Sequence, residues 1–384
     1  MKVSLNYCEN YDFDRLKEIL DKSVESLGGW KTYIQPGDRV LIKPNLLAKK
    51  KPDEAITTHP VFVKALAALL IENGASVVIG DSPGGPFTNA MLTGVYRATG
   101  MEHVANETGA ALNRNFGSFM ADNPRGLLLK KLLMTDMIND VDKIICVAKL
   151  KTHAMMTYTG AVKNMFGLVP GVTKAEYHLN MPKYENFADA LIDVCLACEP
   201  VLTFIDGIVG MEGDGPAAGT PIHTGAVMAS PSPYHLDMVA CRLIGLAPKD
   251  VPMLRRMIDR GMIDAEMLDV EFTCERLTRF EVQPYTPPKS TGAVNFLANY
   301  DERVPKFLKN FLSKYVQTRP VFSDDICNGC AICKEACPVD IIKMKNNKAT
   351  LNHKDCIRCY CCQELCPRRA VTIHRPRLSR LMRL

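Results

Sequence analysis

The chain has 384 residues, of which 47% are hydrophobic and 23% are charged, and its formal net charge is +5. This composition is typical of a soluble globular protein, and the length predicts one large domain with at least one appended unit. The mild positive charge permits an acidic partner or an anionic substrate but gives no reason to expect nucleic acid.

The sequence shows no apolar run typical of a transmembrane helix and no pattern typical of a secretory signal peptide. The longest apolar run, Ala65 to Ile71, is far too short to span a bilayer. The first twenty residues become charged too early for a secretory signal peptide. We therefore expect a cytoplasmic protein without a transmembrane segment.

The first 280 residues alternate helical and strand-like patterns. Continuous apolar strands that alternate with helices predict an α/β fold, with a mostly parallel sheet covered by helices on both faces. Amphipathic or apolar helices are expected over 13–27, 60–74 and 187–199, and strands over 39–45, 76–80, 143–153 and 202–210.

The segment that begins at Glu281 is rich in proline and small residues, which predicts a linker or a loosely packed strap. Apolar residues at helical spacing over 304–315 then predict a docking helix. The basic end is expected to be a solvated tail, with contact to an acidic partner or a membrane surface as the alternative. The predicted organisation is a large α/β domain over 1–280, a linker and docking helix over 281–320, a small C-terminal ferredoxin-type (α+β) domain over 321–374, and a basic tail over 375–384.

Eight of the fifteen cysteines fall in two copies of the pattern C-x2-C-x2-C-x3-C-P, and the second copy repeats the first. In such a repeat three cysteines of one copy bind three irons of a cubane, and the fourth binds the other cluster. The predicted ligands of the first [4Fe–4S] cluster are Cys327, Cys330, Cys333 and Cys366, and those of the second are Cys356, Cys359, Cys362 and Cys337.

One alternative accompanies this prediction. A pair of structural zinc sites is less consistent with the pattern, because zinc ribbons use pairs of cysteines and not quartets that end in proline. Cys361 is outside the repeat and is not expected to be a ligand. The region from Ser323 to Ile373 resembles bacterial two-cluster ferredoxins, which implies one-electron transfer, and residues 341–352 between the two copies predict a hairpin with Asn346-Asn347 at its turn.

Polar side chains follow the predicted strands of the large domain, at the edge where open α/β sheets bind ligands. Lysines from two strands near a glycine-rich loop favour an anionic substrate or cofactor. Acidic residues at the same edge could instead hold a divalent metal. The expected substrate-binding residues are Lys43, Asn45, Asp81, Gly84, Gly85, Lys149, Asn164 and Asp214, and the expected catalytic residues are Lys151, His153, Lys163 and Asp206.

Each of these features also has an ordinary structural interpretation. The stretch "GDSPGG" could be a plain turn, because it does not match a nucleotide-binding pattern and opens no obvious helix. His153 could be a buried structural histidine. Lys163 and Asn164 could begin a solvated helix, although the apolar "MFGLVPG" beside them favours a site. Cys195 and Cys198 are expected to contribute to packing.

Several stretches together resemble one family. "KPNL", "THP", "GDSPGG", "KLKTH", "GAVKNMFGLVPG" and "DGIVGMEGDGP", followed by a two-cluster ferredoxin, are similar to domain-of-unknown-function family 362. The resemblance covers nearly the whole chain. It implies a fold and iron–sulfur clusters but no reaction, and members of this family are common in anaerobic bacteria and archaea.

These observations favour a ferredoxin-linked redox enzyme. Two [4Fe–4S] clusters would relay electrons between a redox partner protein or soluble carrier and an anionic molecule at the α/β domain. The first alternative is a non-enzymatic electron-transfer module, in which the strand-end charges form a docking patch for a partner protein. The second is a non-redox racemase or lyase that uses a metal or another cofactor, with clusters of structural importance only.

Overall fold

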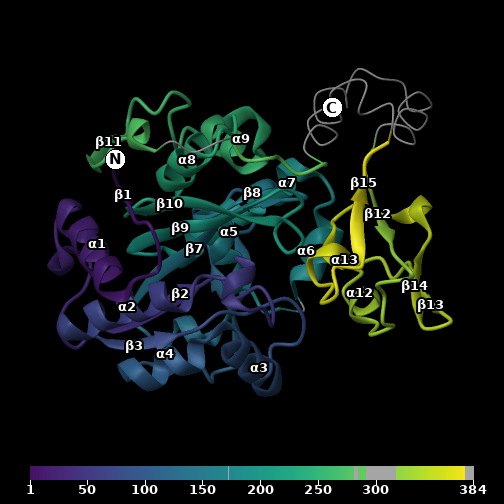
Figure 1. Cartoon of the computed structure of the whole chain (residues 1–384), viewed down its shortest axis with the longest axis horizontal. Coiled ribbons are helices and arrows are strands. Elements are labelled where there is room, and N and C mark those ends of the chain that lie inside the picture. The colour runs from purple at the N-terminus through teal and green to yellow at the C-terminus, as the bar shows by residue number, and fades with distance from the viewer. Residues whose placement is uncertain (172, 281–283, 291–316, 377–384) are drawn as a thin grey trace.

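The computed structural model describes residues 1–171, 173–280, 284–290 and 317–376. Figure 1 shows a large unit built on a twisted central sheet and a smaller unit formed by the C-terminal part of the chain. The small unit lies beside α6, α7 and the loops at one edge of the sheet. Among the described residues, no helix is long and apolar enough to cross a membrane.

The large sheet has nine strands, and its order is β11-β1-β10-β9-β7-β2-β3-β4, with β8 paired to β7. The central strands β9, β7, β2, β3 and β4 run parallel, whereas β10 is antiparallel to both β9 and β1. The predicted α/β fold with a mostly parallel sheet is therefore confirmed. The strands are β1 (Lys2–Tyr7), β2 (Arg39–Pro44), β3 (Ser76–Ile79), β4 (Ala111–Leu112), β7 (Lys143–His153), β8 (Thr157–Thr159), β9 (Leu202–Glu212), β10 (Thr220–Ser230) and β11 (Glu271–Cys274), with a separate hairpin of β5 (Ser118–Asp122) and β6 (Lys131–Thr135).

Helices cover both faces of this sheet because its central strands are apolar on both sides. In β7, Ile145 and Val147 pack in the core formed with α1 to α4, whereas Cys146 and Ala148 pack in the core formed with α5 and α7 to α9. This alternation is the period of two that a strand imposes on its side chains. The helices are α1 (Phe13–Ser26), α2 (Pro60–Glu72), α3 (Asn89–Thr99), α4 (Met101–Thr108), α5 (Ala161–Asn164), α6 (Thr173–Asn180), α7 (Tyr184–Cys198), α8 (Pro233–Leu243) and α9 (Pro252–Asp259).

Local signals fix the helix ends near the predicted positions. The Asp12 side chain accepts a hydrogen bond from the Arg15 amide and begins α1. That helix ends just before Gly28 and Gly29, which have positive φ angles. Gly74 follows α2 in the same left-handed region of φ.

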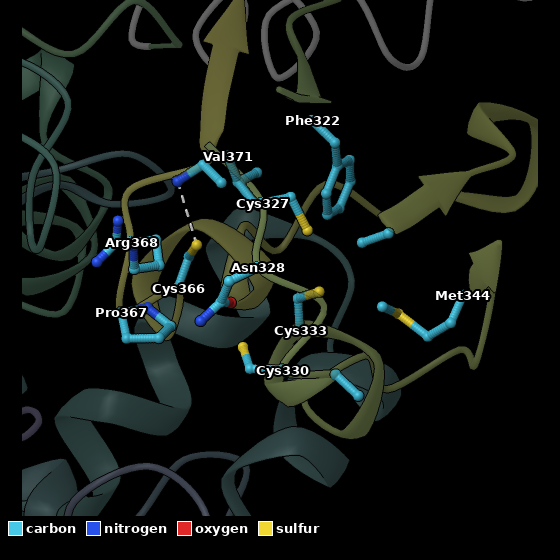
Figure 2. A pocket seen from close by; sticks show the side chains of 13 residues that line it. Phe322, Cys327, Asn328, Cys330, Cys333, Met344, Cys366, Pro367, Arg368 and Val371 are labelled. Atoms are coloured by element: carbon cyan, nitrogen blue, oxygen red, sulfur yellow. Dashed lines mark hydrogen bonds between the residues drawn. The ribbon is translucent and has the colours of Figure 1, made fainter. Parts of the chain in front are cut away.

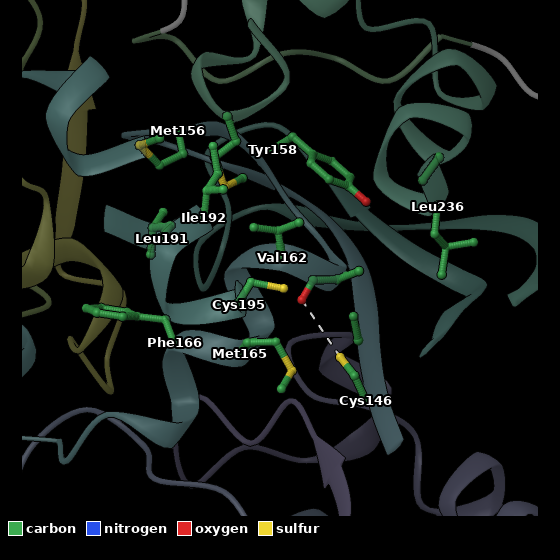
Figure 3. Close-up of a cluster of buried hydrophobic side chains, with 14 of the residues drawn as sticks. Cys146, Met156, Tyr158, Val162, Met165, Phe166, Leu191, Ile192, Cys195 and Leu236 are labelled. Carbon is green, nitrogen blue, oxygen red and sulfur yellow. Dashed lines mark hydrogen bonds between the residues drawn. The ribbon is translucent and has the colours of Figure 1, made fainter. Parts of the chain in front are cut away.

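The cysteine pair of α7 lies in the apolar core. Figure 3 shows Cys195 beside Met165, Val162 and Ile192, with Cys146 on the neighbouring strand. Burial raises the pKa of both Cys195 and Cys198 far above the usual value of a thiol, so both are inert neutral side chains. Their contribution is to packing, as the sequence indicates.

The small unit contains two short antiparallel pairs and two single-turn helices. Its hairpin turns at Asn346 and Asn347, whose φ angles of 48° and 58° fit the predicted turn. The expected docking helix lies within 291–316, outside the described residues. The elements of this unit are β12 (Arg319–Phe322), α12 (Ile332–Glu335), β13 (Ile342–Lys345), β14 (Lys348–Leu351), α13 (Cys361–Glu364) and β15 (Val371–His374).

The described part of the predicted linker, residues 284–290, packs against the large unit. The Tyr285 amide donates to the Ile244 carbonyl, and the Thr286 amide donates to the Glu212 carboxylate at 2.7 Å. The Ser290 hydroxyl donates to the carbonyl of Ala154. This short stretch is therefore an anchored strap and not a free linker.

Candidate functional site

The polar residues at the carboxyl edge of the sheet depend on α5, a single turn that carries Lys163 and Asn164. The Asp237 carboxylate accepts hydrogen bonds from the amides of Ala161 at 2.6 Å and Val162 at 2.9 Å, and from the Tyr158 hydroxyl at 2.9 Å. These bonds satisfy the first amides of the turn. Asp237 is completely buried, and burial raises its pKa to about 6. It is a positioning residue that no pattern in the sequence indicates.

Lys43 from β2 lies in the first of two buried ion pairs. Its ammonium group is 2.8 Å from Asp81 and donates to the side-chain oxygen of Asn164 at 2.9 Å. Both charged side chains are almost completely buried. A Cβ atom at Gly167 would lie 2.1 Å from the Asp81 carboxylate, so only glycine fits there. Lys43, Asp81 and Asn164 are thus brought together as expected, but they bind one another.

Asn45 connects this group to Lys151 of β7. The Asn45 side chain donates to Asn164 at 3.2 Å and accepts from the Lys151 ammonium at 2.7 Å. Lys151 also donates to the carbonyl of Ile56 at 2.6 Å. Burial lowers the pKa of Lys151 well below its usual value, and the positive charges of Lys163 and Lys149 lower it further.

Lys149 and Asp206 form the second buried ion pair, at 2.8 Å, and lie opposite each other in the β7–β9 register. Tyr11 donates to Asp206 at 2.8 Å and accepts from Lys149 at 2.9 Å. The His59 amide donates to the other Asp206 oxygen at 2.9 Å, and the Tyr11 ring stacks on the His59 ring. Asp206 lies within β9 and not at its end, and its carboxylate is taken up by Lys149, Tyr11 and the His59 amide.

His153, at the end of β7, contacts the small unit. Its Nδ1 atom accepts hydrogen bonds from the amides of Met155 at 3.1 Å and Met156 at 3.3 Å. The proton of the neutral ring is therefore on Nε2. This nitrogen is 3.0 Å from an oxygen of Glu364. The two groups are close but are not aligned as in a regular hydrogen bond. Burial lowers the pKa of His153 to about 4, and Lys163 contributes to the shift.

Glu364 belongs to the second cysteine copy and was not predicted as a site residue. Burial alone would raise its pKa, but His153, Lys163 and His178 lower it to about 2. The carboxylate is therefore charged and faces three basic side chains of the large unit. No sequence signal in "CCQELCP" distinguishes this glutamate from an ordinary surface residue.

The glycine-rich loop after β3 forms part of the contact between the two units. A Cβ atom at Gly84 would lie 2.9 Å from the side chain of Leu365, so the absence of a side chain makes room for the small unit. Gly85 has a φ angle of 97°. Other contacts join Gln363 to the carbonyl of Asp214 at 2.7 Å and Arg369 to Glu54 at 3.1 Å.

The acidic residues at the end of β9 and just after it, Glu212 and Asp214, have different partners. Glu212 accepts from the Thr286 amide, and Asp214 forms an ion pair with Lys289 at 2.7 Å. Within the described ranges no three His, Cys, Asp or Glu side chains form a group that could hold a single metal ion. The carboxylate of Asp214 thus binds Lys289 of the strap, and its backbone carbonyl accepts from Gln363 of the small unit.

Two further basic residues come from α6. Lys174 donates to the Ser82 carbonyl, and its ammonium group lies 5.9 Å from the centre of the Phe166 ring. Burial lowers the pKa of Lys174 to about 7. His178 stacks on Phe187, and burial lowers its pKa to about 4. The spacing of four residues between Lys174 and His178 is a signal that sequence reasoning could have used.

A cavity in the small unit is lined by the four cysteines predicted for the first cluster. Figure 2 shows Cys327, Cys330, Cys333 and Cys366 around this space, with Phe322 and Met344 as apolar walls. The Ala370 amide donates to the Cys366 sulfur at 3.2 Å. Four thiols around one space fit the ligand set of an iron–sulfur cubane.

The other predicted set is also close together. Burial raises the pKa of Cys362, and the neighbouring charges of Cys359, Cys356, Cys333 and Cys337 contribute to the increase, so Cys362 also lies near a member of the first set. Cys361 is buried beside this set and begins α13, the single turn that ends at Glu364, which contacts His153 of the large unit. The second set of cysteines is therefore adjacent to the basic residues of the large unit.

Comparison with known proteins identifies relatives of both units. The chain is 36% identical over 256 residues to the thylakoid-associated protein sll1697 of Synechocystis, covering 66% of this chain and 77% of that protein. The solved lactate racemase apoprotein of Thermoanaerobacterium thermosaccharolyticum is a remote structural match, with 13% identity, a TM-score of 0.40 and coverage of 63% of this chain and 57% of that one. A Thermotoga maritima protein matches with 13% identity, a TM-score of 0.34 and coverage of 54% and 52%.

The chain thus spans less than two thirds of the length of these two solved chains. A 4Fe-4S dicluster domain matches residues 319–367, so the chain is an iron–sulfur protein of the ferredoxin type. The domain of unknown function DUF362 matches residues 40–242, more than half of the chain, and the protein therefore belongs to the DUF362 family.

Proposed function

We propose that this protein is a redox enzyme that passes electrons from an external one-electron carrier to a small anionic molecule at the carboxyl edge of its sheet. The observation that carries the proposal is the 3.0 Å contact between Glu364 of the small unit and His153 of the large unit. Since electron tunnelling slows steeply with distance, this contact brings the proposed donor and acceptor sites into useful proximity.

The proposed ligands are the two predicted sets of cysteines. Cys327, Cys330, Cys333 and Cys366 would hold one [4Fe–4S] cluster, and Cys356, Cys359, Cys362 and Cys337 would hold the other. Such a cluster takes up and releases one electron at a time. The cavity lined by the first set and the mutual proximity of the second set support this assignment.

The large unit would bind and orient the acceptor. Lys163 is the lysine of α5 that remains partly exposed, so we assign it to the anion. The neutral His153 ring directs its Nε2 hydrogen toward Glu364, so we assign it to orienting that carboxylate and the small unit rather than to proton donation. Lys43 and Lys151, which are already bound by neighbouring groups, would hold α5 and the loop of Asn45 in place.

A non-enzymatic electron-transfer module is the second candidate. In that case the strand-end lysines should form an exposed patch for a partner protein. Lys43, Lys149 and Lys151 are instead at most 2% exposed, so they are not available to a partner. This burial favours the enzyme.

The two candidates differ in the acceptor they need. We would reduce the anaerobic holoprotein chemically and mix it with two fractions of an anaerobic cell extract, one restricted to small molecules and one to proteins. Reoxidation of the clusters would be followed by absorbance and electron paramagnetic resonance. The enzyme predicts reoxidation by the small-molecule fraction, and Lys163→Met should slow it while both clusters remain.

Lys143→Met is the matched control, because Lys143 is a partly exposed lysine at the opposite end of β7. Equal reoxidation rates in the native protein and Lys163→Met would contradict an acceptor site at Lys163. Reoxidation by the protein fraction alone would favour the electron-transfer module.

A further inference from the structure

Two lysines near the contact between the units have no carboxylate partner. In the part of the chain that the structure describes, the Lys163 side chain has neither a hydrogen bond nor an ion pair within 4 Å. Lys174 donates only to the backbone carbonyl of Ser82. The loop of Ser82 connects their two segments, because its amide donates to the Gly167 carbonyl just after α5 and its carbonyl accepts from Lys174 of α6. They differ in this from Lys43 and Lys149, each of which has a carboxylate.

Unsatisfied polar atoms lie beside these lysines. The Ser82 hydroxyl is buried and has no hydrogen-bond partner, and Ser82 is the residue whose carbonyl binds Lys174. His178, one helical turn after Lys174, has a buried Nδ1 atom that is also without a partner. Because buried polar groups are normally hydrogen-bonded, orphan atoms from two elements indicate a missing ligand or water.

The local charge balance indicates a ligand with negative charge. Lys43 is paired with Asp81, whereas Lys163 and Lys174 lack a carboxylate within 4 Å among the described residues. Basic groups therefore outnumber carboxylates on this side of the contact between the units. Uncompensated charge in a poorly solvated region is costly, so the folded protein gains when an anion neutralises it.

A small ligand could reach this position from solvent. Gly84, Gly85, Lys163, Lys174 and Glu364 are all partly exposed, and they come from four different segments around one place. Lys43 and Lys151 lie deeper in the structure and are buried. The partly exposed residues therefore mark the outer side of the cluster, where the glycine loop, α5, α6 and α13 meet.

We propose that Lys163 and Lys174, with the Ser82 hydroxyl and His178, bind the phosphate group of a small phosphorylated molecule. This inference rests on the proposed function, because the molecule bound here would be the electron acceptor. A phosphate ester carries about −1.5 to −2 charges near neutral pH and has three acceptor oxygens for the two lysines, the Ser82 hydroxyl and His178, whereas a carboxylate has one charge and two oxygens. Lysine ammonium groups bind phosphate as point charges.

A competing explanation is that the lysines compensate the negative charge of the second cysteine set and its irons. Cys361 interacts with Lys163 and lies next to Cys362, so this explanation uses the same geometry. It makes a different prediction, because removal of the lysines should then impair cluster assembly and not phosphate binding.

The test is calorimetric titration of inorganic phosphate into the anaerobic holoprotein, with acetate as the monoanionic comparison. We expect one phosphate to bind per chain and acetate to bind more weakly. Lys163→Met and Lys174→Met should each weaken phosphate binding about tenfold or more, since each removes a charged hydrogen bond. Lys143→Met should leave the affinity unchanged. Iron and sulfide are counted in every variant.

Three results would overturn the inference: no phosphate binding by the native protein, acetate binding as tight as phosphate binding, or loss of iron in both lysine variants with Lys143→Met intact. Phosphate binding and electron relay are measured separately. Failed phosphate binding with reoxidation that still depends on Lys163 would reject the ligand class alone. Phosphate binding without such reoxidation would reject the relay.

Discussion

The Lys149–Asp206 pair allows a direct test of structural against catalytic roles. Asp206 accepts from Lys149, Tyr11 and the His59 amide, and the pair is 1% and 0% exposed. Lys149→Met leaves a buried carboxylate with two neutral donors. Breaking a buried ion pair from one side costs about 3–5 kcal/mol, and the two remaining donors place our expectation at the lower end of that range.

The assay is urea unfolding followed by the fluorescence of Trp30, the one tryptophan of the chain, which is buried in the large unit. The double variant Lys149→Met/Asp206→Leu should be less destabilised than the sum of Lys149→Met and Asp206→Leu, because no charge is left uncompensated. Lys143→Met is the control. A loss of less than about 1 kcal/mol in Lys149→Met, together with loss of cluster reoxidation, would refute the structural role.

Three other predictions concern the small unit and its contacts. Cys361→Ala should retain eight irons and eight sulfides by native mass spectrometry, whereas Cys359→Ala should lose a cluster; equal loss would contradict the ligand assignment. Glu364→Gln should speed hydrogen exchange at the Met155 and Met156 amides about tenfold, because it weakens the contact that holds the His153 ring, and this ring accepts hydrogen bonds from both amides. Unchanged exchange would argue against the contact between Glu364 and His153. Burial lowers the pKa of Lys174 from 10.5, the value of an exposed lysine, to about 7, so the unfolded chain binds this proton more tightly than the folded protein does. The free energy of unfolding should therefore rise with pH from about 7 to about 10.5. Lys174→Met should lack this rise.

The elements that sequence reasoning predicts best are those with strong local signals. β7 is a continuous apolar run that ends in charged residues, and it forms a strand from Lys143 to His153. The hairpin turn at Asn346-Asn347 follows from the preference of asparagine for positive φ. The cysteine repeat identifies the iron–sulfur unit because its spacing has one chemical explanation.

The arrangement of the site was only partly predictable. The sequence predicts that Lys43 and Lys149 converge, but their side chains belong to opposite faces of the sheet. Lys43 shares a face with Leu41 and Lys149 shares one with Val147, because each pair is two residues apart on its strand. Leu41 and Val147 belong to different cores. The alternation of strand side chains contains this information, and a residue-by-residue reading of both strands would have separated the two lysines. The position of Glu364 depends on the docking of two units distant in sequence, which no local pattern encodes.

The charges at the carboxyl edge then divide into two kinds with different consequences. Lys149 with Asp206 and Lys43 with Asp81 are neutral pairs, each completed by hydrogen bonds from its own face of the sheet. They attract a further anion weakly, because their fields largely cancel. Lys163 and Lys174 are not cancelled in this way, and they lie where the cysteine-rich unit meets the sheet. A negative ligand and an electron arriving at this place would each be stabilised by the same two charges, which is the physical reason to expect binding and reduction at one site.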